Sequence, residues 1–293
     1  MQCIVQLAPV FSCLVQDPEC VCSDPELIVA MDNCVLNRCT FKQSLTTKRI
    51  WDRTCGFPER DRSAVILLCG VAGASVAFTA YILRMVLKLP YFGEQIHADD
   101  WAISVAIVFG IPLGVISVPL ANAGLGKDIW NIPFDDLTYI LKLYYVQEVM
   151  YLVTMDVTKV SILFFYLRIF PSERFKIICY VVLCITIGYG MAFVLAALFQ
   201  CTPVHLAWDR WDGEQENYTC SNINLLGWVS AAIDIILDVV IITLPTKQLM
   251  GLALSLKKKI HVVFMFGVGF FVTTISIARL KSLLQFGKSN NFT

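Results

Sequence analysis

The sequence has little charge and almost no histidine. Of its 293 residues, only 16% are Asp, Glu, Lys or Arg, and the three histidines are His97, His205 and His261. No Ser-His-Asp arrangement, pair of metal-binding histidines or phosphate-binding glycine loop is visible, so we do not expect an enzyme. The formal net charge is zero, which provides no bulk attraction to nucleic acid.

Hydrophobic residues, in contrast, make up 57% of the chain, more than a soluble globular protein needs. They are gathered into six apolar runs that are long enough to cross a bilayer as helices. The runs cover residues 64–87, 101–125, 141–167, 177–199, 225–244 and 260–280. The sequence therefore predicts an all-α membrane protein surrounded by a lipid bilayer.

Cysteines are concentrated at the start of the chain. Seven of the twelve lie in the first 55 residues, namely Cys3, Cys13, Cys20, Cys22, Cys34, Cys39 and Cys55. This density is typical of a disulfide framework in an oxidising, extracytoplasmic compartment. A zinc site is the weaker alternative, because CxC replaces CxxC and the segment has no histidine. We expect a cysteine-rich module over residues 1–62, in which residues 48–62 form a charged link to a membrane domain over residues 63–293. Cys201 and Cys220 bracket a later loop and are expected to form a disulfide.

Loop charges predict the orientation in the membrane. If the amino terminus is outside, the inner connections carry Arg84, Lys88, Arg168, Arg174, Lys176, Lys247, Lys257, Lys258 and Lys259. The outer connections carry only Lys127 and Arg210, which is the positive-inside pattern. The glycosylation sequons at Asn217 and Asn291 then also lie outside. The loop charges and the two sequons thus indicate an extracellular amino terminus.

Charged residues also occur at membrane depth. The third apolar run carries Glu148, Asp156 and Lys159, and the fifth carries Asp234 and Asp238, four residues apart on one helix face. A charge that faces lipid is costly, so these side chains are expected to face the bundle interior or a wet cavity. Lys159 and Asp238 lie at similar depths, and we predict that Lys159 contacts Asp238 or Asp156. Two interpretations stay open: pairs that hold the bundle in register, or a ligand or signalling role.

The cysteine spacing resembles that of the CFEM domain, an eight-cysteine extracellular module of fungi. The matching pattern is Cys13-x6-Cys20-x-Cys22-x11-Cys34-x4-Cys39-x15-Cys55. The first of the eight cysteines is missing, and Cys3 matches the second. No signal peptide is recognisable before it, so the module is expected to be truncated at its start.

The resemblance implies a disulfide pairing and a cofactor. The pairs would be Cys13 with Cys20, Cys3 with Cys34 and Cys22 with Cys55, which leaves Cys39 without a partner. In the family, an aspartate three residues before the CxC is the axial ligand of haem iron, and that position is Asp17 here. A carboxylate is a hard anionic donor that favours ferric iron. The alternative is that Asp17-Pro18 is an ordinary turn.

Residues 63–293 resemble the fungal rhodopsin-like integral membrane domain. The matching residues are Asp99-Asp100-Trp101, Gly124-Leu125-Gly126, Lys159-x-Ser161-x-Leu163-x-x-Tyr166-x-Arg168-Ile169-Phe170, Phe199-Gln200-Cys201-x-Pro203, Trp208-Asp209 before Cys220, Leu244-Pro245 and Arg279. That family has seven spans and this sequence has six apolar runs, so we expect the seventh span to be truncated. The resemblance implies no retinal, because no seventh helix is present to carry a Schiff-base lysine.

The resemblance to both families implies a plasma-membrane, receptor-like protein. It would sense an extracellular cue or surface, host surfaces during colonisation included, and signal to a cytoplasmic partner. The chief rival is a haem- or iron-binding surface protein, or an infection-related effector, whose bundle is mainly an anchor. A transporter is a third class, because intramembrane acids suit a proton or ion path. The lack of a detectable inverted repeat argues against the transporter.

Overall fold

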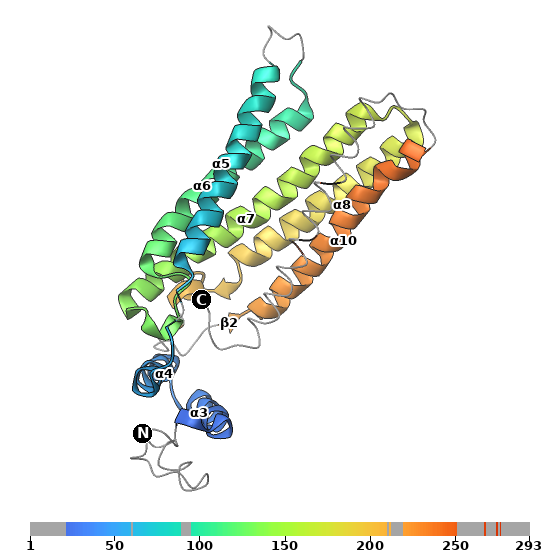
Figure 1. The fold of residues 1–293 in the computed structure, drawn as a ribbon. Coiled ribbons are helices and arrows are strands. Elements are labelled where there is room, and N and C mark those ends of the chain that lie inside the picture. Colours follow the sequence, from blue (N-terminus) through green and yellow to red (C-terminus); the bar gives the residue numbers. More distant parts are fainter. Residues whose placement is uncertain are drawn as a thin grey trace.

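The computed structural model describes residues 22–59, 61–88, 95–209, 211 and 219–250, together with the single positions 267, 274 and 276. Five of its helices are long and apolar enough to cross a membrane. Figure 1 shows these helices side by side, with two short helices at one end of the bundle. We call the end beside the short helices the cap end and the opposite end the distal end.

The two short helices have strong start signals. Asp24 caps the first helix by accepting a hydrogen bond from the Glu26 N–H at 2.9 Å, and Thr40 and Gln43 form a capping box at the second. The charged residues 48–55, which we expected in a linker, are therefore helical, and that expectation is wrong for them. A helix that begins at a capped residue can continue through a charged stretch when it buries apolar side chains against other elements. These helices are α3 (Pro25–Arg38) and α4 (Phe41–Cys55).

A disulfide between Cys22 and Cys55 joins the start of α3 to the end of α4, as the family pairing implied. Cys34 is also disulfide-bonded, and its expected partner Cys3 lies outside the described residues, as do Cys13 and Cys20. Cys39, for which no partner was expected, carries a free thiol.

The long helices coincide with the first five expected spans. Their bounds are α5 (Ser63–Leu87), α6 (Ala98–Ala123), α7 (Phe134–Ile169), α8 (Glu173–Leu198) and α10 (Ile223–Met250). The sixth expected run, 260–280, lies outside the described residues except at Gly267, Thr274 and Ser276, which are helical. Helix α7 has 36 residues and would measure about 54 Å, well beyond the ~30 Å hydrocarbon thickness of a bilayer. Part of α7 therefore projects out of the membrane.

Short elements close the cap end. A two-stranded antiparallel hairpin pairs Cys201 with Cys220 in register, and the expected disulfide joins these two residues. The hairpin connects the end of α8 to the start of α10, so the disulfide ties two long helices together. The elements are η2 (Ile129–Asn131), β1 (Cys201–Thr202), α9 (Leu206–Asp209) and β2 (Thr219–Cys220).

Small residues allow α5 and α6 to approach closely. A Cβ atom added at Gly114 would collide with the Ala74 side chain, and one added at Gly70 would collide with Ser117. Close backbone approach of this kind is how membrane helices gain packing energy without a hydrophobic driving force. Helix α7 lies between α6 and α8 and packs against both. Near the distal end, α7, α8 and α10 share a core of Leu163, Tyr166, Phe170, Phe175, Cys179, Val182, Leu183 and Ile241.

Candidate functional site

An ion-pair cluster lies inside the bundle between α7 and α10. The ammonium nitrogen of Lys159 is 2.5 Å from Asp234 Oδ1 and 3.3 Å from Asp238 Oδ1. Lys159 is 4% exposed, and each aspartate is 7% exposed. The two acids lie one turn apart on the same face of α10, so a single lysine reaches both. The expected contact with Asp238 is present, and Asp234, which the depth argument did not single out, is closer.

A further segment joins the cluster through Asp238. Its Oδ2 accepts a hydrogen bond from the Ser276 hydroxyl at 3.2 Å, and Ser276 is 7% exposed. Ser276 lies within the sixth expected run. The cluster therefore connects α7, α10 and a third helical position that is remote in sequence.

Asp156 lies near the cluster on the α8 side of α7. It is 8% exposed, and its carboxylate packs on Gly190 of α8, where an added Cβ would lie 2.5 Å from Oδ2. Asp156 interacts electrostatically with Lys159 and Asp234 but has no ion pair within 4 Å among the described residues. Glu148 is half-buried and lies eleven residues before Lys159, a rise of about 16 Å, so it is not part of the cluster.

A second ionic network ties the distal ends of α5 and α6 together. Arg84 of α5 donates to Asp99 at 2.6 Å and to Asp100 at 2.9 Å, and Lys88 donates to Asp100 at 2.7 Å. Asp99 and Asp100 are 1% and 0% exposed. The carboxylate of Asp100 also accepts from the His97 N–H at 3.0 Å and so caps α6.

Helix α7 joins this distal network. The Ser161 hydroxyl donates to the backbone carbonyl of Asp99 at 2.8 Å, and Arg168 approaches the Asp99 carboxylate to 4.0 Å. The sequence analysis used Asp99 and Asp100 only as part of the family resemblance and missed their partners. The signal was present, because Arg84 and Lys88 are spaced four apart at the end of the preceding span and so share one face.

At the cap end, α4 docks on the bundle. Leu45 of α4 forms a buried cluster with Ile129 of η2 and Leu137 of α7. The Arg49 guanidinium donates to the backbone carbonyls of Trp130 and of Ile132, the latter at 2.6 Å. A guanidinium that bridges two carbonyls of a connection fixes both position and angle.

Cation–π contacts surround this docking site. The Lys42 ammonium lies 5.4 Å from the ring centre of Phe134 and 5.9 Å from that of Trp211, and the Lys48 ammonium lies 5.7 Å from the ring centre of Trp130. Each such contact is worth about 0.5–1 kcal/mol at partly exposed positions. The start of α7 and the connection before it thus form the platform for α4.

The hairpin at the cap end is anchored on α7. The Tyr145 hydroxyl donates to the Leu198 carbonyl at 2.8 Å, and its ring lies 5.3 Å from that of Trp208. The Lys142 ammonium lies 5.7 Å from the centre of the Trp208 ring. Trp208, which belongs to the motif that resembles the fungal rhodopsin-like domain, therefore acts as a packing residue between α9 and α7.

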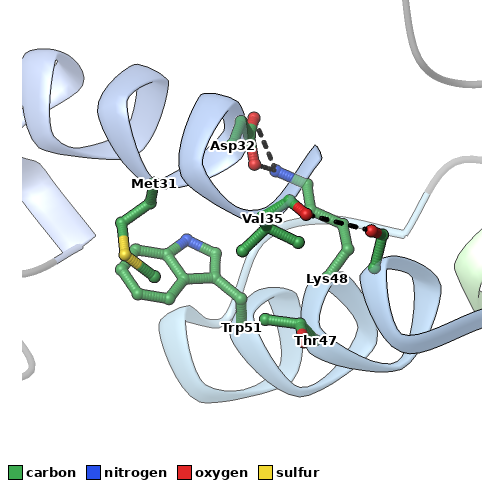
Figure 2. A pocket seen from close by; sticks show the side chains of 7 residues that line it. Met31, Asp32, Val35, Thr47, Lys48 and Trp51 are labelled. Atoms are coloured by element: carbon green, nitrogen blue, oxygen red, sulfur yellow. Dashed lines mark hydrogen bonds and ion pairs between the residues drawn. The ribbon is translucent and has the colours of Figure 1, made fainter. Parts of the chain in front are cut away.

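A small cavity lies between α3 and α4. Figure 2 shows Met31, Val35 and Trp51 around it, with Lys48 paired to Asp32 at its rim. Its volume is about 30 Å³, which is the space of a single water molecule. The buried Trp51 Nε1 has no hydrogen-bond acceptor among the described residues, and a water would supply one. The cavity is far too small for a haem.

Asp52, in the cap, has a shifted pKa. Burial raises the pKa of Asp52 on α4, and the charge of Lys48, whose nitrogen is 3.9 Å away, offsets part of this rise. The nearby carboxylates of Asp128 and Asp32 add to the rise.

Several expected site residues lie outside the described residues: Asp17, Asn217 and Asn291. The haem ligand and both glycosylation sites therefore stay predictions.

Long apolar helices with ion pairs in their interior define a polytopic α-helical membrane protein. The fungal rhodopsin domain family matches residues 83–293, and the chain belongs to that family. The CFEM domain matches residues 1–56, so the cap, α3 and α4, is a CFEM domain.

Three curated fungal proteins are similar to this chain. The first is "SAT4 family membrane protein" of Emericella nidulans, 31% identical over 171 residues, which cover 57% of this chain and 44% of that protein. The second is "Polyenoic acids biosynthesis gene cluster protein Ba17b" of Metarhizium anisopliae, 27% identical over 59% of this chain and 48% of that protein. The third is "Fugralins biosynthesis cluster protein 2" of Gibberella zeae, 28% identical over 55% of this chain and 40% of that protein. The chain spans less than half the length of each relative, and no solved structure matches it.

Proposed function

We propose that the protein is a receptor-like sensor of the plasma membrane, with its CFEM domain outside the cell and its distal end in the cytoplasm. The extracellular ligand or surface, host surfaces included, would act on the CFEM domain, and a signalling partner would bind the distal end. The positive-inside pattern supports this orientation, because Arg84, Arg168, Arg174 and Lys176 lie at the distal end.

The observation that carries the proposal is the docking of α4 on the start of α7. Leu45 and Arg49 contact η2 and α7 directly, so a movement of the CFEM domain is passed to a spanning helix rather than absorbed in a linker. A domain that was merely anchored would need no such contact. In the receptor hypothesis, this contact transmits a change in the CFEM domain to α7.

In the receptor hypothesis, the distal network responds to the movement of α7 on the cytoplasmic side. It joins α5, α6 and α7 through Arg84, Asp99 and Ser161. Buried ion pairs have discrete geometries rather than a continuum, so a shift of α7 along its axis would break or re-form these contacts. The helix that receives the CFEM contact is thus also a member of the network at the opposite membrane face.

The test compares two arginines of α4. Arg49→Ala removes the contacts with Trp130 and Ile132, whereas Arg53→Ala changes an exposed side chain of the same helix. Purified full chain in lipid nanodiscs would be treated with trypsin, and the cleavage rate at Arg174 and Lys176 in the first turn of α8 would be measured. Local opening sets such rates. We expect a several-fold change for Arg49→Ala and none for Arg53→Ala.

Equal cleavage rates in both variants and the wild type would overturn the coupling. The result would favour the rival in which the bundle is mainly an anchor.

The rival hypothesis of a haem- or iron-binding surface protein has its own test. The CFEM match includes Asp17, the position implied as the axial iron ligand. Titration of the purified full chain with haemin would show a shift of the Soret band that Asp17→Ala abolishes. An unchanged Soret band in the wild type would remove the haem hypothesis and leave the CFEM domain as a recognition module.

A further inference from the structure

The cluster inside the bundle contains more acid than base. Asp156, Asp234 and Asp238 surround a single cation, Lys159, and all four side chains are at least nine-tenths buried. With every carboxylate ionised, the cluster would carry a formal charge of −2. An excess of charge at membrane depth is costly, because neither lipid nor apolar side chains solvate it.

Two of the three acids have donors. Asp234 and Asp238 both contact the Lys159 ammonium, and Asp238 also accepts from Ser276. Hydrogen bonds of this kind stabilise the ionised form of a carboxyl group. These two groups are therefore the anions of the cluster.

Asp156 differs from them. It is 8% exposed, and no hydrogen-bond donor reaches its carboxylate from the ranges that the structure describes. Its oxygen lies against Gly190 of α8 so closely that an added Cβ would be 2.5 Å away. A buried carboxylate without donors is far less stable than the neutral carboxylic acid.

Apart from Lys159, the described residues of α6 and α8 provide Asp156 with no compensating positive charge. The part of α6 after Trp101 contains no ionisable residue, and α8 beyond Lys176 offers only the thiols of Cys179 and Cys184 and the phenols of Tyr180 and Tyr189. The Tyr189 hydroxyl donates to the Ser230 carbonyl of α10 at 2.8 Å.

On the neighbouring elements the nearest charges are those of the cluster itself. Lys159 on α7 already forms ion pairs with Asp234 and Asp238 of α10. Glu148 on α7 is eight residues before Asp156, a rise of about 12 Å. Within the ranges that the structure describes, the charge on Asp156 therefore has no cation of its own.

We propose that this cluster is a proton-binding site and that the proton resides on Asp156. Asp156 takes one proton from a hydronium ion, which becomes water as the carboxyl O–H bond forms, and the formal charge of the cluster changes from −2 to −1. The proposal does not depend on the receptor role.

Protonation would control the contact between α7 and α8. With Asp156 neutral, its close packing on Gly190 needs no solvation. Loss of the proton would place an uncompensated anion in that contact and force the two helices apart or admit water. The site would thus make the packing of the bundle depend on proton concentration.

Infrared difference spectroscopy of the full chain in nanodiscs tests the proposal directly. A protonated carboxylic acid has a C=O stretch at higher frequency than a carboxylate, and the band shifts in D2O. We expect this band at neutral pH in the wild type and its loss in Asp156→Asn. Glu148→Gln, which changes another intramembrane acid of α7, should retain the band.

The melting temperatures of aspartate-to-asparagine variants provide a second test. Asparagine has nearly the shape of a protonated aspartate, so Asp156→Asn should leave the melting temperature nearly unchanged, whereas Asp234→Asn, which removes a partner of Lys159, should lower it. A wild-type spectrum without the band, or a band that persists in Asp156→Asn, would overturn the proposal. A loss of stability in Asp156→Asn as large as that in Asp234→Asn would also overturn it.

Discussion

The ammonium nitrogen of Lys159 lies 2.5 Å from a carboxylate oxygen of Asp234, and both residues are buried inside the membrane-spanning bundle. This pair joins the third and the fifth spanning helices, α7 and α10. Loss of Lys159 would leave the buried carboxylates of Asp234 and Asp238 without their shared cation.

Lys159→Met should therefore impair folding strongly. Removing one member of a buried ion pair costs about 3–5 kcal/mol. We expect little Lys159→Met protein at the cell surface and a lower melting temperature in detergent. The double variant Lys159→Met with Asp234→Leu should recover part of the loss, because it removes one of the two carboxylates that lost their cation. A double variant no better than the sum of the single changes would contradict the pairing.

The distal network should contribute more than an exposed ion pair of the same type. Asp100→Ala would leave Lys88 and the His97 N–H without this buried acceptor, at a cost of about 3 kcal/mol or more. Glu173→Ala is the control, since its pair with Lys176 is exposed and should change stability by less than about 0.5 kcal/mol. The melting temperatures of the two variants measure this difference. Similar melting temperatures would show that the distal network contributes no more than an exposed ion pair.

The thiol of Cys39 should react with a membrane-impermeant maleimide added outside intact cells. It is half-buried and unpaired, and the proposed orientation places it outside. Cys39→Ser should abolish this labelling, whereas the buried Cys179 should remain unlabelled in both proteins. A peptide in which Cys39 is disulfide-linked within the monomer, found by mass mapping, would show that the expected pairing is wrong.

The proposed topology predicts where glycans attach. Glycosidase treatment should increase the electrophoretic mobility of the protein, and Asn217→Gln should reduce that change. A sequon engineered into residues 168–176 at the distal end should stay unmodified, because that connection faces the cytoplasm. Glycosylation of the engineered sequon would reverse the topology.

Asp52 should make the stability of the cap depend on pH. Its pKa is raised in the folded protein by burial, so the folded state holds this proton more tightly than the unfolded state, where the pKa is about 3.9. The free energy of unfolding therefore falls as pH rises from about 4 through the raised value. Asp52→Asn removes this fall, and relative to the wild type it should be more stable at pH 7 than at pH 4.

Melting temperatures at both pH values would measure the Asp52 effect. Glu59→Gln, which changes an exposed residue just after α4, is the control and should show the same difference from the wild type at pH 4 and pH 7. If Asp52→Asn behaves like this control, the cap does not bury Asp52 as described.

The sequence alone was enough for the class and the outline of the fold. Each spanning helix is an apolar run of bilayer length, and such a run has no stable alternative in lipid because its backbone must satisfy its own hydrogen bonds. The cysteine spacing and the residues of the membrane domain likewise sufficed to identify both families. Disulfides Cys22–Cys55 and Cys201–Cys220 followed from the family pairing and from the loop they bracket.

The partners of the charges required the tertiary structure. Helical periodicity places Asp234 and Asp238 on one face, but the rotation of α10 against α7 decides which oxygen lies nearer to Lys159. The docking of α4 was missed for a related reason. Its charged sequence resembles a linker, and only the position of Trp130 and Ile132 reveals that Arg49 has carbonyls to bind. Local sequence determines which residues are buried or charged, whereas the packing of helices far apart in the chain determines which of them meet.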